Sequence, residues 1–485
     1  MLNEYRLWTA SAGVLTSTAL VLSGCALSVD GEATSIYDDP FQVAGLEVTS
    51  GPSGARKGVP DANLPVTGTD GGEIDRVVAN AVSDIEDYWR SQFPALFQRD
   101  FEPVEELISW DPRDLDGPRF CGDSTAELLN AGYCSIDHTI GWDRALLVPE
   151  VAEKFGTVAA VFVLAHEYGH AVQTKAGIAV ANTGGGDIVR EQQADCFAGA
   201  FMRHIAEDKS AHFTLSTSEG LNNVLASVVA IGDPDPSDSG NVHGSAFERV
   251  TVTQIGFTDG PAACTRIDES EIKSRRADLP QQFTDELDNG ELPVTEESIE
   301  AFFHSFQQIF DLSDQPELDL TGADLDCSDA AATEPVSYCP ATNTIGVDVD
   351  LLAERGTPDY SRRRELVQTE LTGDYNAYVL LASRYTLALQ HARGDNLSSP
   401  KTALRAACLS GVITAALSPD NPATLEAGSV WLSPGDLDEA VSGLLTDGLA
   451  ASDVNGQTVP SGFSRIDAFR TGVLGGEHAC EVRYR

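Results

Sequence analysis

Two histidines and a glutamate stand close together in the segment HEYGH, inside an apolar stretch over residues 158–176. The stretch reads VAAVFVLAHEYGHAVQTKA and predicts a largely buried helix. On a helix, positions i and i+4 share a face, so the imidazoles of His166 and His170 can reach one metal ion. Glu167 can lie beside a metal-bound water and act as its general base. The motif alone also arises by chance, so its surroundings must be considered.

A third ligand is expected from a second helix. Gly177 is a plausible stop for the first helix, and Asp187, which follows three glycines, is a plausible N-cap for the next. Catalytic zinc needs a third protein ligand and one open position, and we assign that third ligand to Glu191. Asp195 lies one turn further on the same face and can accept an imidazole N–H. Alone, such a pair suits a solvated face, but apolar neighbours over residues 194–201 favour burial beside a cation.

His243 is a further candidate, and the sequence leaves its role open. A histidine near a zinc site can stabilise the oxyanion that forms when a carbonyl is attacked. The alternative is a structural histidine that caps a helix beginning near Ser245.

These segments together resemble a known family. HEYGHAVQ, EQQADCFAGAF, the stretch AIGD from Ala230 and the stretch HGS leading to Arg249 are similar to the neutral zinc metallopeptidases of bacteria, over residues 73–268. The Glu-x-x-Ala-Asp element also resembles the third-ligand helix of HExxH zincins whose third ligand is glutamate. The resemblance implies a mainly α fold with small β elements (α+β), Zn²⁺ as cofactor and hydrolysis of peptide bonds.

The cysteines repeat in a pattern once Cys25 is set aside. Short spacings of 13 and 12 residues and long spacings of 68 and 72 occur in the same order in each half of the chain. YCSIDHTIGWD from Tyr133 also returns as YCPATNTIGVD from Tyr338. We therefore predict a tandem duplication, with related domains at residues 63–275 and 276–485. By symmetry, the expected disulfides are Cys121–Cys134, Cys196–Cys264, Cys327–Cys339 and Cys408–Cys480.

The second copy lacks the residues that could do the chemistry. We aligned FVLAHEYGHAVQ with VLLASRYTLALQ and anchored later positions on the matched cysteines and on Arg249 and Arg465. Opposite His166, Glu167, His170, Glu191, Asp195 and His243 stand Ser383, Arg384, Leu387, Ala403, Ala407 and Val459. The second domain is therefore predicted to be a degenerate, metal-free copy. It could form a wall of the substrate cleft, dock a partner envelope protein or serve stability alone.

The N-terminus predicts export and a lipid anchor. Residues 7–22 are apolar, too short for a membrane span and typical of a secretory signal. They end in Leu-Ser-Gly-Cys, which resembles the bacterial lipobox, so residues 1–24 are expected to be removed and Cys25 lipidated. Residues 25–62 are rich in Gly, Ser, Asp and Pro and are expected to form a flexible acidic tether. An ordinary signal peptide with a chance cysteine is the alternative.

Charge narrows the range of partners. The 485 residues include 31 Lys and Arg against 75 Asp and Glu, a net charge of −44, which disfavours nucleic acid. We predict a zinc metallopeptidase on the extracytoplasmic face of the bacterial membrane, attached only through Cys25 and acting on protein or peptide substrates. The alternatives are a non-catalytic envelope scaffold with a structural or idle zinc, and a hydrolase of a non-protein amide.

Overall fold

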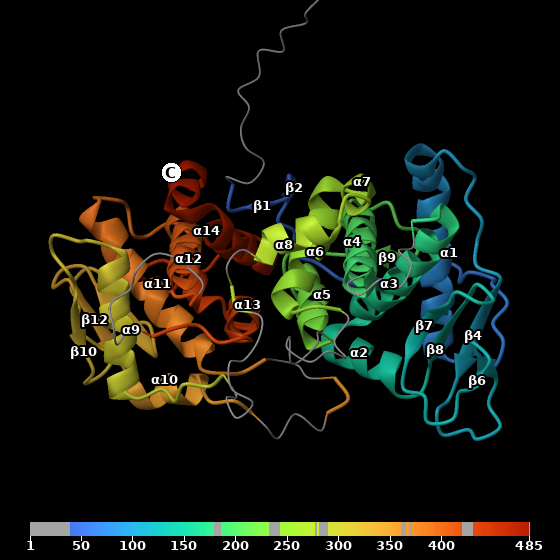
Figure 1. Cartoon of the computed structure of the whole chain (residues 1–485), viewed down its shortest axis with the longest axis horizontal. Coiled ribbons are helices and arrows are strands. Elements are labelled where there is room, and N and C mark those ends of the chain that lie inside the picture. The colour runs from blue at the N-terminus through green and yellow to red at the C-terminus, as the bar shows by residue number, and fades with distance from the viewer. Residues whose placement is uncertain are drawn as a thin grey trace, which may run out of the picture. The chain divides into compact units, whose positions relative to one another are not determined.

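Helices dominate the structure, a computed structural model that describes residues 39–178, 186–231, 243–276, 279–280, 290–359, 365–367, 371–419 and 430–484. The first half (residues 39–276) holds α1 Glu73–Phe97, α2 Leu147–Phe155, α3 Thr157–Ala176, α4 Gly186–Ala206, α5 Glu219–Ala230, α6 Ala246–Asp259, α7 Pro261–Cys264 and α8 Glu269–Arg276 (Figure 1). The second half (residues 290–484) holds α9 Glu296–Ile309, α10 Val349–Arg355, α11 Tyr375–Ala392, α12 Pro400–Ala416, α13 Asp436–Thr446, the 3₁₀ helix η2 Leu449–Ala451 and α14 Gly462–Arg483. The predicted class, mainly α with small β elements, is confirmed.

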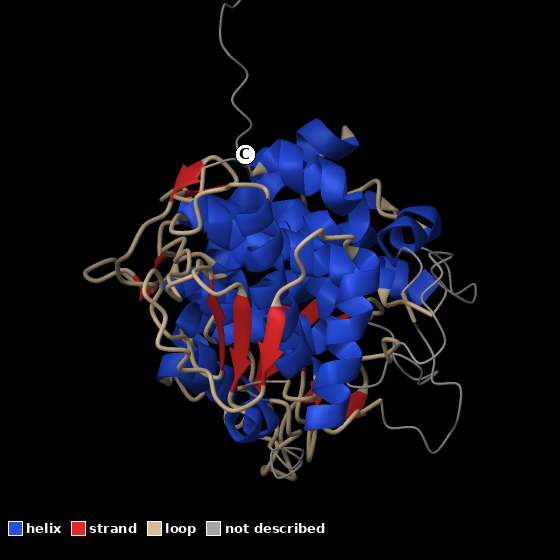
Figure 2. Ribbon diagram, turned by 90° about the vertical axis from the view of Figure 1, so that its left-hand side faces the viewer, coloured by secondary structure: helices blue, strands red, loops and turns tan. Residues whose placement is uncertain are grey.

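The strands are short, and half of those described lie in two three-stranded sheets of the same topology. They are β1 Gln42–Val43, β2 Leu46–Glu47, β3 Gly54–Ala55, β4 Glu106–Trp110, β5 Arg119–Phe120, β6 Asp123–Ser124, β7 Ala131–Cys134, β8 Thr139–Asp143, β9 Phe213–Thr214, β10 Glu317–Asp319, β11 Val336–Cys339 and β12 Thr344–Val347. In the order β4-β8-β7, β4 runs parallel to β8 and β7 antiparallel, with Tyr133 opposite Ile140. The order β10-β12-β11 repeats this, with Tyr338 opposite Ile345. Figure 2 faces this second sheet, which lies in front of the helices.

All four predicted disulfides are present: Cys121–Cys134, Cys196–Cys264, Cys327–Cys339 and Cys408–Cys480. In each half the short bridge lies at the small sheet, where one of its cysteines ends a strand (β7 or β11). The long bridge joins α4 to α7 in the first half and α12 to α14 in the second. A bridge that closes a loop of about 70 residues restricts the unfolded chain strongly and so stabilises the fold.

The two halves share a hydrophobic core. One continuous cluster of buried apolar side chains extends from Val43 to Tyr484. In the first half α4 packs against α3 and α6, and in the second α12 packs against α11 and α14. Across the halves, α13 and α14 pack against α5 and α6, and residues 36–485 form one unit. The two predicted domains are therefore joined by a core that both contribute to.

The predicted tether extends too far along the chain. Val43 is buried in the core, and β3 pairs with β9. The N–H of Thr49 also donates to Oγ1 of Thr217 at 2.8 Å. Residues 39–62 thus belong to the folded unit, because their few apolar side chains and backbone groups find partners that their composition does not reveal. The predicted signal peptide, Cys25 and the rest of the tether lie outside the described residues.

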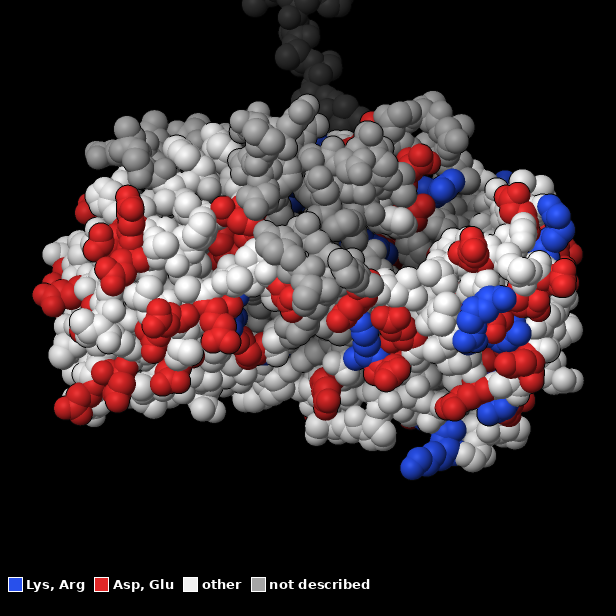
Figure 3. Space-filling model, turned by 90° about the horizontal axis from the view of Figure 1, so that it is seen from below, with Lys and Arg blue, Asp and Glu red and all other residues white. Residues whose placement is uncertain are grey.

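The described surface is strongly acidic. Asp and Glu side chains spread over the face seen in Figure 3, whereas Lys and Arg lie mainly on its right-hand side. Of the helices that the structure describes, none has the length and apolar character needed to cross a bilayer.

Candidate metal centre

Helix α3 presents two imidazoles from the core of the first half. Its apolar residues bury it, and it ends where Gly177 takes a left-handed conformation (φ +71°), as the sequence predicted. The rings of His166 and His170 face the same side of the helix, with centroids 4.9 Å apart. His166 is buried and His170 is partly exposed. The four-residue spacing therefore places one ring deep in the protein and the other nearer its edge.

Helix α4 brings the third predicted ligand to the same point. The two helices pack closely because Gly169 of α3 has no side chain. A Cβ at this position would lie only 2.9 Å from Cα of Ala194 on α4. Glu191 is buried one turn before this contact. The helix begins at Gly186, so Asp187 lies in its first turn rather than at the predicted N-cap. The glycine run thus ends inside the helix.

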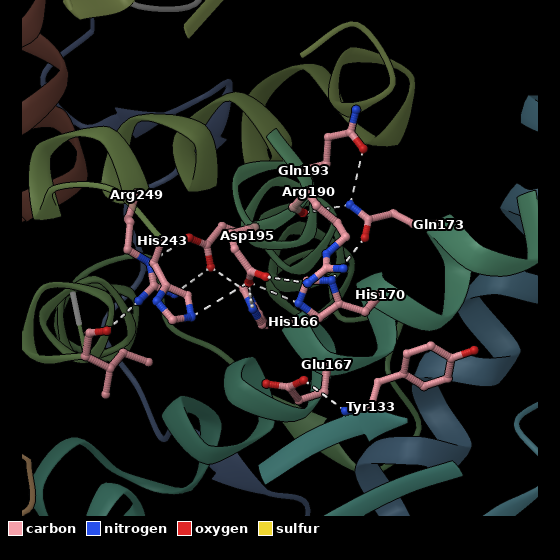
Figure 4. A network of polar contacts seen from close by, with 12 residues as sticks. Tyr133, His166, Glu167, His170, Gln173, Arg190, Gln193, Asp195, His243 and Arg249 are labelled. Carbon is pink, nitrogen blue, oxygen red and sulfur yellow. Dashed lines mark hydrogen bonds and ion pairs between the residues drawn. The ribbon is translucent and has the colours of Figure 1, made fainter. Parts of the chain in front are cut away.

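The three predicted ligands converge at one point. Figure 4 shows two of them, His166 and His170, beside Asp195 and His243. Oε2 of Glu191 lies 3.2 Å from Nε2 of His166 and 3.1 Å from Nε2 of His170. Two atoms that each lie 2.0–2.1 Å from a tetrahedral zinc are themselves separated by about 3.3 Å. Two imidazole nitrogens and one carboxylate oxygen also form a donor set typical of catalytic zinc. The residues present therefore fit a zinc ion.

Asp195 and Arg249 hold the deeper histidine. Oδ1 of Asp195 lies 2.7 Å from Nδ1 of His166, as the sequence predicted, which leaves Nε2 directed at Glu191. Arg249 of α6 donates to the same carboxylate from Nε (2.7 Å) and Nη2 (2.9 Å). Both Asp195 and Arg249 are almost fully buried. This paired contact fixes the carboxylate and, through it, the orientation of His166.

The electrostatics of the centre favour a cation. Burial opposes charge on His166, but the carboxylates of Asp195 and Glu191 outweigh it and raise the imidazole pKa to about 10. Burial alone would raise the pKa of Glu191, yet hydrogen bonds from both histidines hold it far below its usual range. Burial also opposes charge on Asp195, but Arg249 and His166 lower its pKa. Both carboxylates thus remain ionised inside the protein.

His170 has its own supporting residue. Its Nδ1 lies 3.0 Å from Oε1 of Gln173, which is fully buried. The amide nitrogen of Gln173 donates to the carbonyl of Arg190 at 2.7 Å, on the helix that carries Glu191. Gln173 therefore links the two ligand helices. The sequence signal for this role is the position of Gln173 three residues after His170, on the same face of the helix.

Glu167 borders a cavity beside the donors. The cavity has a volume of about 140 Å³, and Glu167, His166 and His243 contribute to its lining. The N–H of Tyr133 on β7 donates to Oε2 of Glu167 at 3.1 Å, which orients the carboxylate. The predicted base thus lies next to both the donors and the space that a reacting group would enter.

His243 lies at the same cavity. Its Nε2 is 3.7 Å from Oε2 of Glu191, and its side chain is 37% exposed. Ser245, and not His243, is the N-cap of α6, because its side chain accepts the N–H of Glu248. His243 therefore does not occupy the N-cap position, and its role stays a prediction. Gly244 takes φ +91°, a conformation that suits glycine and turns the chain between the two residues.

The aligned positions of the second half contain no donor cluster of this kind among the described residues. Arg384, aligned with Glu167, is buried and donates to the carbonyl of Val336 and to Oγ of Ser452, both at 3.0 Å. Burial lowers its pKa to about 10. Gln390, aligned with Gln173, is fully buried, and neither its amide oxygen nor its nitrogen has a hydrogen-bond partner among the described residues.

Gln390→Leu is expected to stabilise the protein. The substitution removes two buried polar atoms without partners, whose desolvation costs about 1–3 kcal/mol. Urea unfolding should therefore show an increase of about 1 kcal/mol in the free energy of unfolding. Gln173→Leu is the matched control and should destabilise, because Gln173 has partners. A loss of stability in Gln390→Leu would show that its amide has partners in solution.

Comparison with known proteins points to one family. The sequence model of the family described as Putative neutral zinc metallopeptidase matches residues 24–267. Uncharacterized protein Rv2575 of Mycobacterium tuberculosis is 27% identical over 175 residues, which cover 31% of this chain and 59% of that protein. Uncharacterized protein YpfJ of Escherichia coli is 28% identical over 208 residues, or 38% and 68% of the two chains. The chain thus spans less than two thirds of the mycobacterial relative. No solved structure matches it.

Proposed function

Because the chain belongs to the Putative neutral zinc metallopeptidase family, we propose that it is a zinc-dependent peptidase whose active site lies in the first half. The observation that carries this proposal is the convergence of His166, His170 and Glu191 beside a cavity that Glu167 borders. A structural zinc normally has four protein ligands and no open side. Among the described residues the cluster has three donors and an adjoining cavity, which favours catalysis over a structural or idle zinc.

Each residue at the centre has a distinct role in this mechanism. Zinc, when bound by the three donors, supplies Lewis acidity toward a peptide carbonyl and toward water. Glu167 takes a proton from the attacking water and passes it to the leaving amine. His243 donates a hydrogen bond to the developing oxyanion. Asp195 and Gln173 hold the two imidazoles in position.

The surroundings suit an extended peptide with an apolar side chain. Leu147, Val148, Val151, Ala160 and Val163 line the cavity, which has room for about five water molecules. Among the described residues, β7 pairs only with β8, and the N–H of Tyr133 donates to Glu167. The rest of its free edge can pair with an extended chain. These features favour a peptide with a medium-sized apolar residue over a non-protein amide.

We also propose the setting in which this activity operates. The lipobox-like segment ending in Cys25 supports a lipoprotein on the extracytoplasmic face of the membrane. The matched sheets, disulfides and helix packing of the two halves support a tandem duplication whose second copy has lost its metal site. At this location the proposed peptidase would act on proteins or peptides outside the cytoplasm. The acidic surface disfavours nucleic acid as a partner.

Removing zinc is expected to destabilise the full chain. A ligand present at 1,000 times its dissociation constant stabilises the folded state by about 4 kcal/mol. Protein treated with a chelator should therefore melt several degrees lower than protein reloaded with zinc, and it should not cleave peptides. His170→Ala is the control, and its melting temperature should not respond to zinc. Equal melting temperatures for zinc-free and zinc-loaded wild type would contradict the proposal.

A further inference from the structure

The start of α6 is completed by a residue of the second half. The first N–H groups of a helix lack partners within it. Ser245 accepts the N–H of Glu248, while Asp438 of α13 accepts those of Ala246 (3.0 Å) and Phe247 (2.8 Å). Asp438 is only 6% exposed. A buried carboxylate on two helix N–H groups is a strong, charge-assisted contact.

A corresponding contact, with a single N–H, occurs in reverse at the start of α14. Ser461 is its N-cap, and Oδ1 of Asn222 on α5 accepts the N–H of Gly462 at 2.7 Å. Asn222 and Asp438 are 216 positions apart, as are Ala246 and Gly462, and Ser245 and Ser461. The same shift separates the aligned Arg249 and Arg465. The halves therefore meet as the subunits of a symmetric dimer do, each capping a helix of the other.

The two caps differ in what their helices carry. Arg249 lies in the first turn of α6 and holds Asp195, which in turn holds His166. His243 lies just before the same turn, at the cavity. In α14 the corresponding arginine is Arg465, whose Nη2 donates to the carbonyl of Leu445 at 3.2 Å, and Val459 stands opposite His243. Movement of α6 would thus disturb the metal centre, whereas movement of α14 would not.

We propose that Asp438, from the half without metal ligands, is a positioning residue for the metal centre. It holds the first turn of α6, so that Arg249 fixes Asp195 and His243 stays at the cavity. This role rests on the proposed function, and it gives the second half a specific part in the activity. Figure 1 shows α13 and α14 against α5 and α6, where both caps lie.

The test compares Asp438→Ala with Asn222→Ala in the full-length chain. Zinc affinity is measured by competition with a chelating dye, and backbone exposure by hydrogen–deuterium exchange of peptides covering residues 243–250 and 461–466. For Asp438→Ala we expect zinc affinity to fall about 10-fold and exchange at residues 243–250 to rise about fivefold. For Asn222→Ala we expect faster exchange at 461–466 only, with zinc affinity unchanged.

The outcomes separate positioning from general stability. Wild-type exchange and zinc affinity in Asp438→Ala would overturn the proposal, as would equal losses of zinc affinity in the two variants. If Asp438→Ala does not fold, Asp438→Asn, which keeps one acceptor, replaces it. A zinc affinity of Asp438→Asn below that of Asn222→Ala supports the proposal, and equal zinc affinities of these two variants overturn it. If the wild type binds no zinc, the proposed function fails, and the exchange data alone still decide whether Asp438 holds α6.

Discussion

Glu167→Gln is expected to lower the rate of peptide hydrolysis by about 10²- to 10⁴-fold, the usual contribution of a general base. Glutamine keeps the shape of the side chain and can still accept the N–H of Tyr133, so the cavity should be unchanged. It cannot take a proton from water. Glu167 is also outside the donor cluster of His166, His170 and Glu191, so zinc should remain bound. The measurement is kcat on a cleaved peptide, together with zinc content.

The control is Glu219→Gln, the same change at an exposed position of α5. It should leave both hydrolysis and zinc content at wild-type levels. Full activity in Glu167→Gln would refute the assigned base, whereas loss of zinc from this variant would mean that the glutamate serves as a ligand.

Asp195→Ala is expected to weaken zinc binding by about 10- to 100-fold and to destabilise the fold by about 3–5 kcal/mol. The change leaves the guanidinium of Arg249 buried without its carboxylate and removes the acceptor that orients His166. Loss of one member of a buried ion pair is costly because the other charge stays desolvated. Zinc competition and urea unfolding measure the two effects.

Asp84→Ala separates the loss of zinc affinity from the loss of stability. Asp84 is a buried carboxylate that lies 2.6 Å from Nδ1 of His212 and accepts the N–H of the same residue at 2.9 Å. Its removal should also destabilise the fold, because His212 loses its buried hydrogen-bond acceptor. Neither residue belongs to the metal centre, so zinc affinity should be unchanged. If Asp84→Ala weakened zinc binding as much as Asp195→Ala does, the loss of zinc affinity in Asp195→Ala would reflect general destabilisation and not the lost contact with His166.

Local patterns in the sequence were sufficient for much of the fold and the site. An apolar run with a glycine stop gave helix α3 nearly residue for residue, and matched cysteine spacings gave all four disulfides. The i, i+4 pairs on two helices were enough to expect that His166, His170 and Glu191 would converge. These predictions succeed because helical periodicity and repeated cysteine spacings can be read directly from the sequence.

Long-range partners could not be predicted in this way. Arg249 lies 54 residues from the Asp195 that it holds, and Asp438 lies 192 residues from Ala246. No local periodicity relates such pairs, because tertiary packing alone brings them together. The predicted tether is wrong over residues 39–62 for the same reason. Their composition favours disorder, but the folded unit offers them strand and side-chain partners.

The most direct measurement of the central claim titrates zinc into metal-free protein and follows peptide hydrolysis against zinc bound per chain. Unstructured peptides serve as substrates, and new termini are read by mass spectrometry. We predict that hydrolysis rises in proportion to bound zinc and levels off at one ion per chain, with cleavage beside medium-sized apolar residues. Full zinc occupancy without any cleavage, or cleavage that proceeds equally without zinc, would contradict the account.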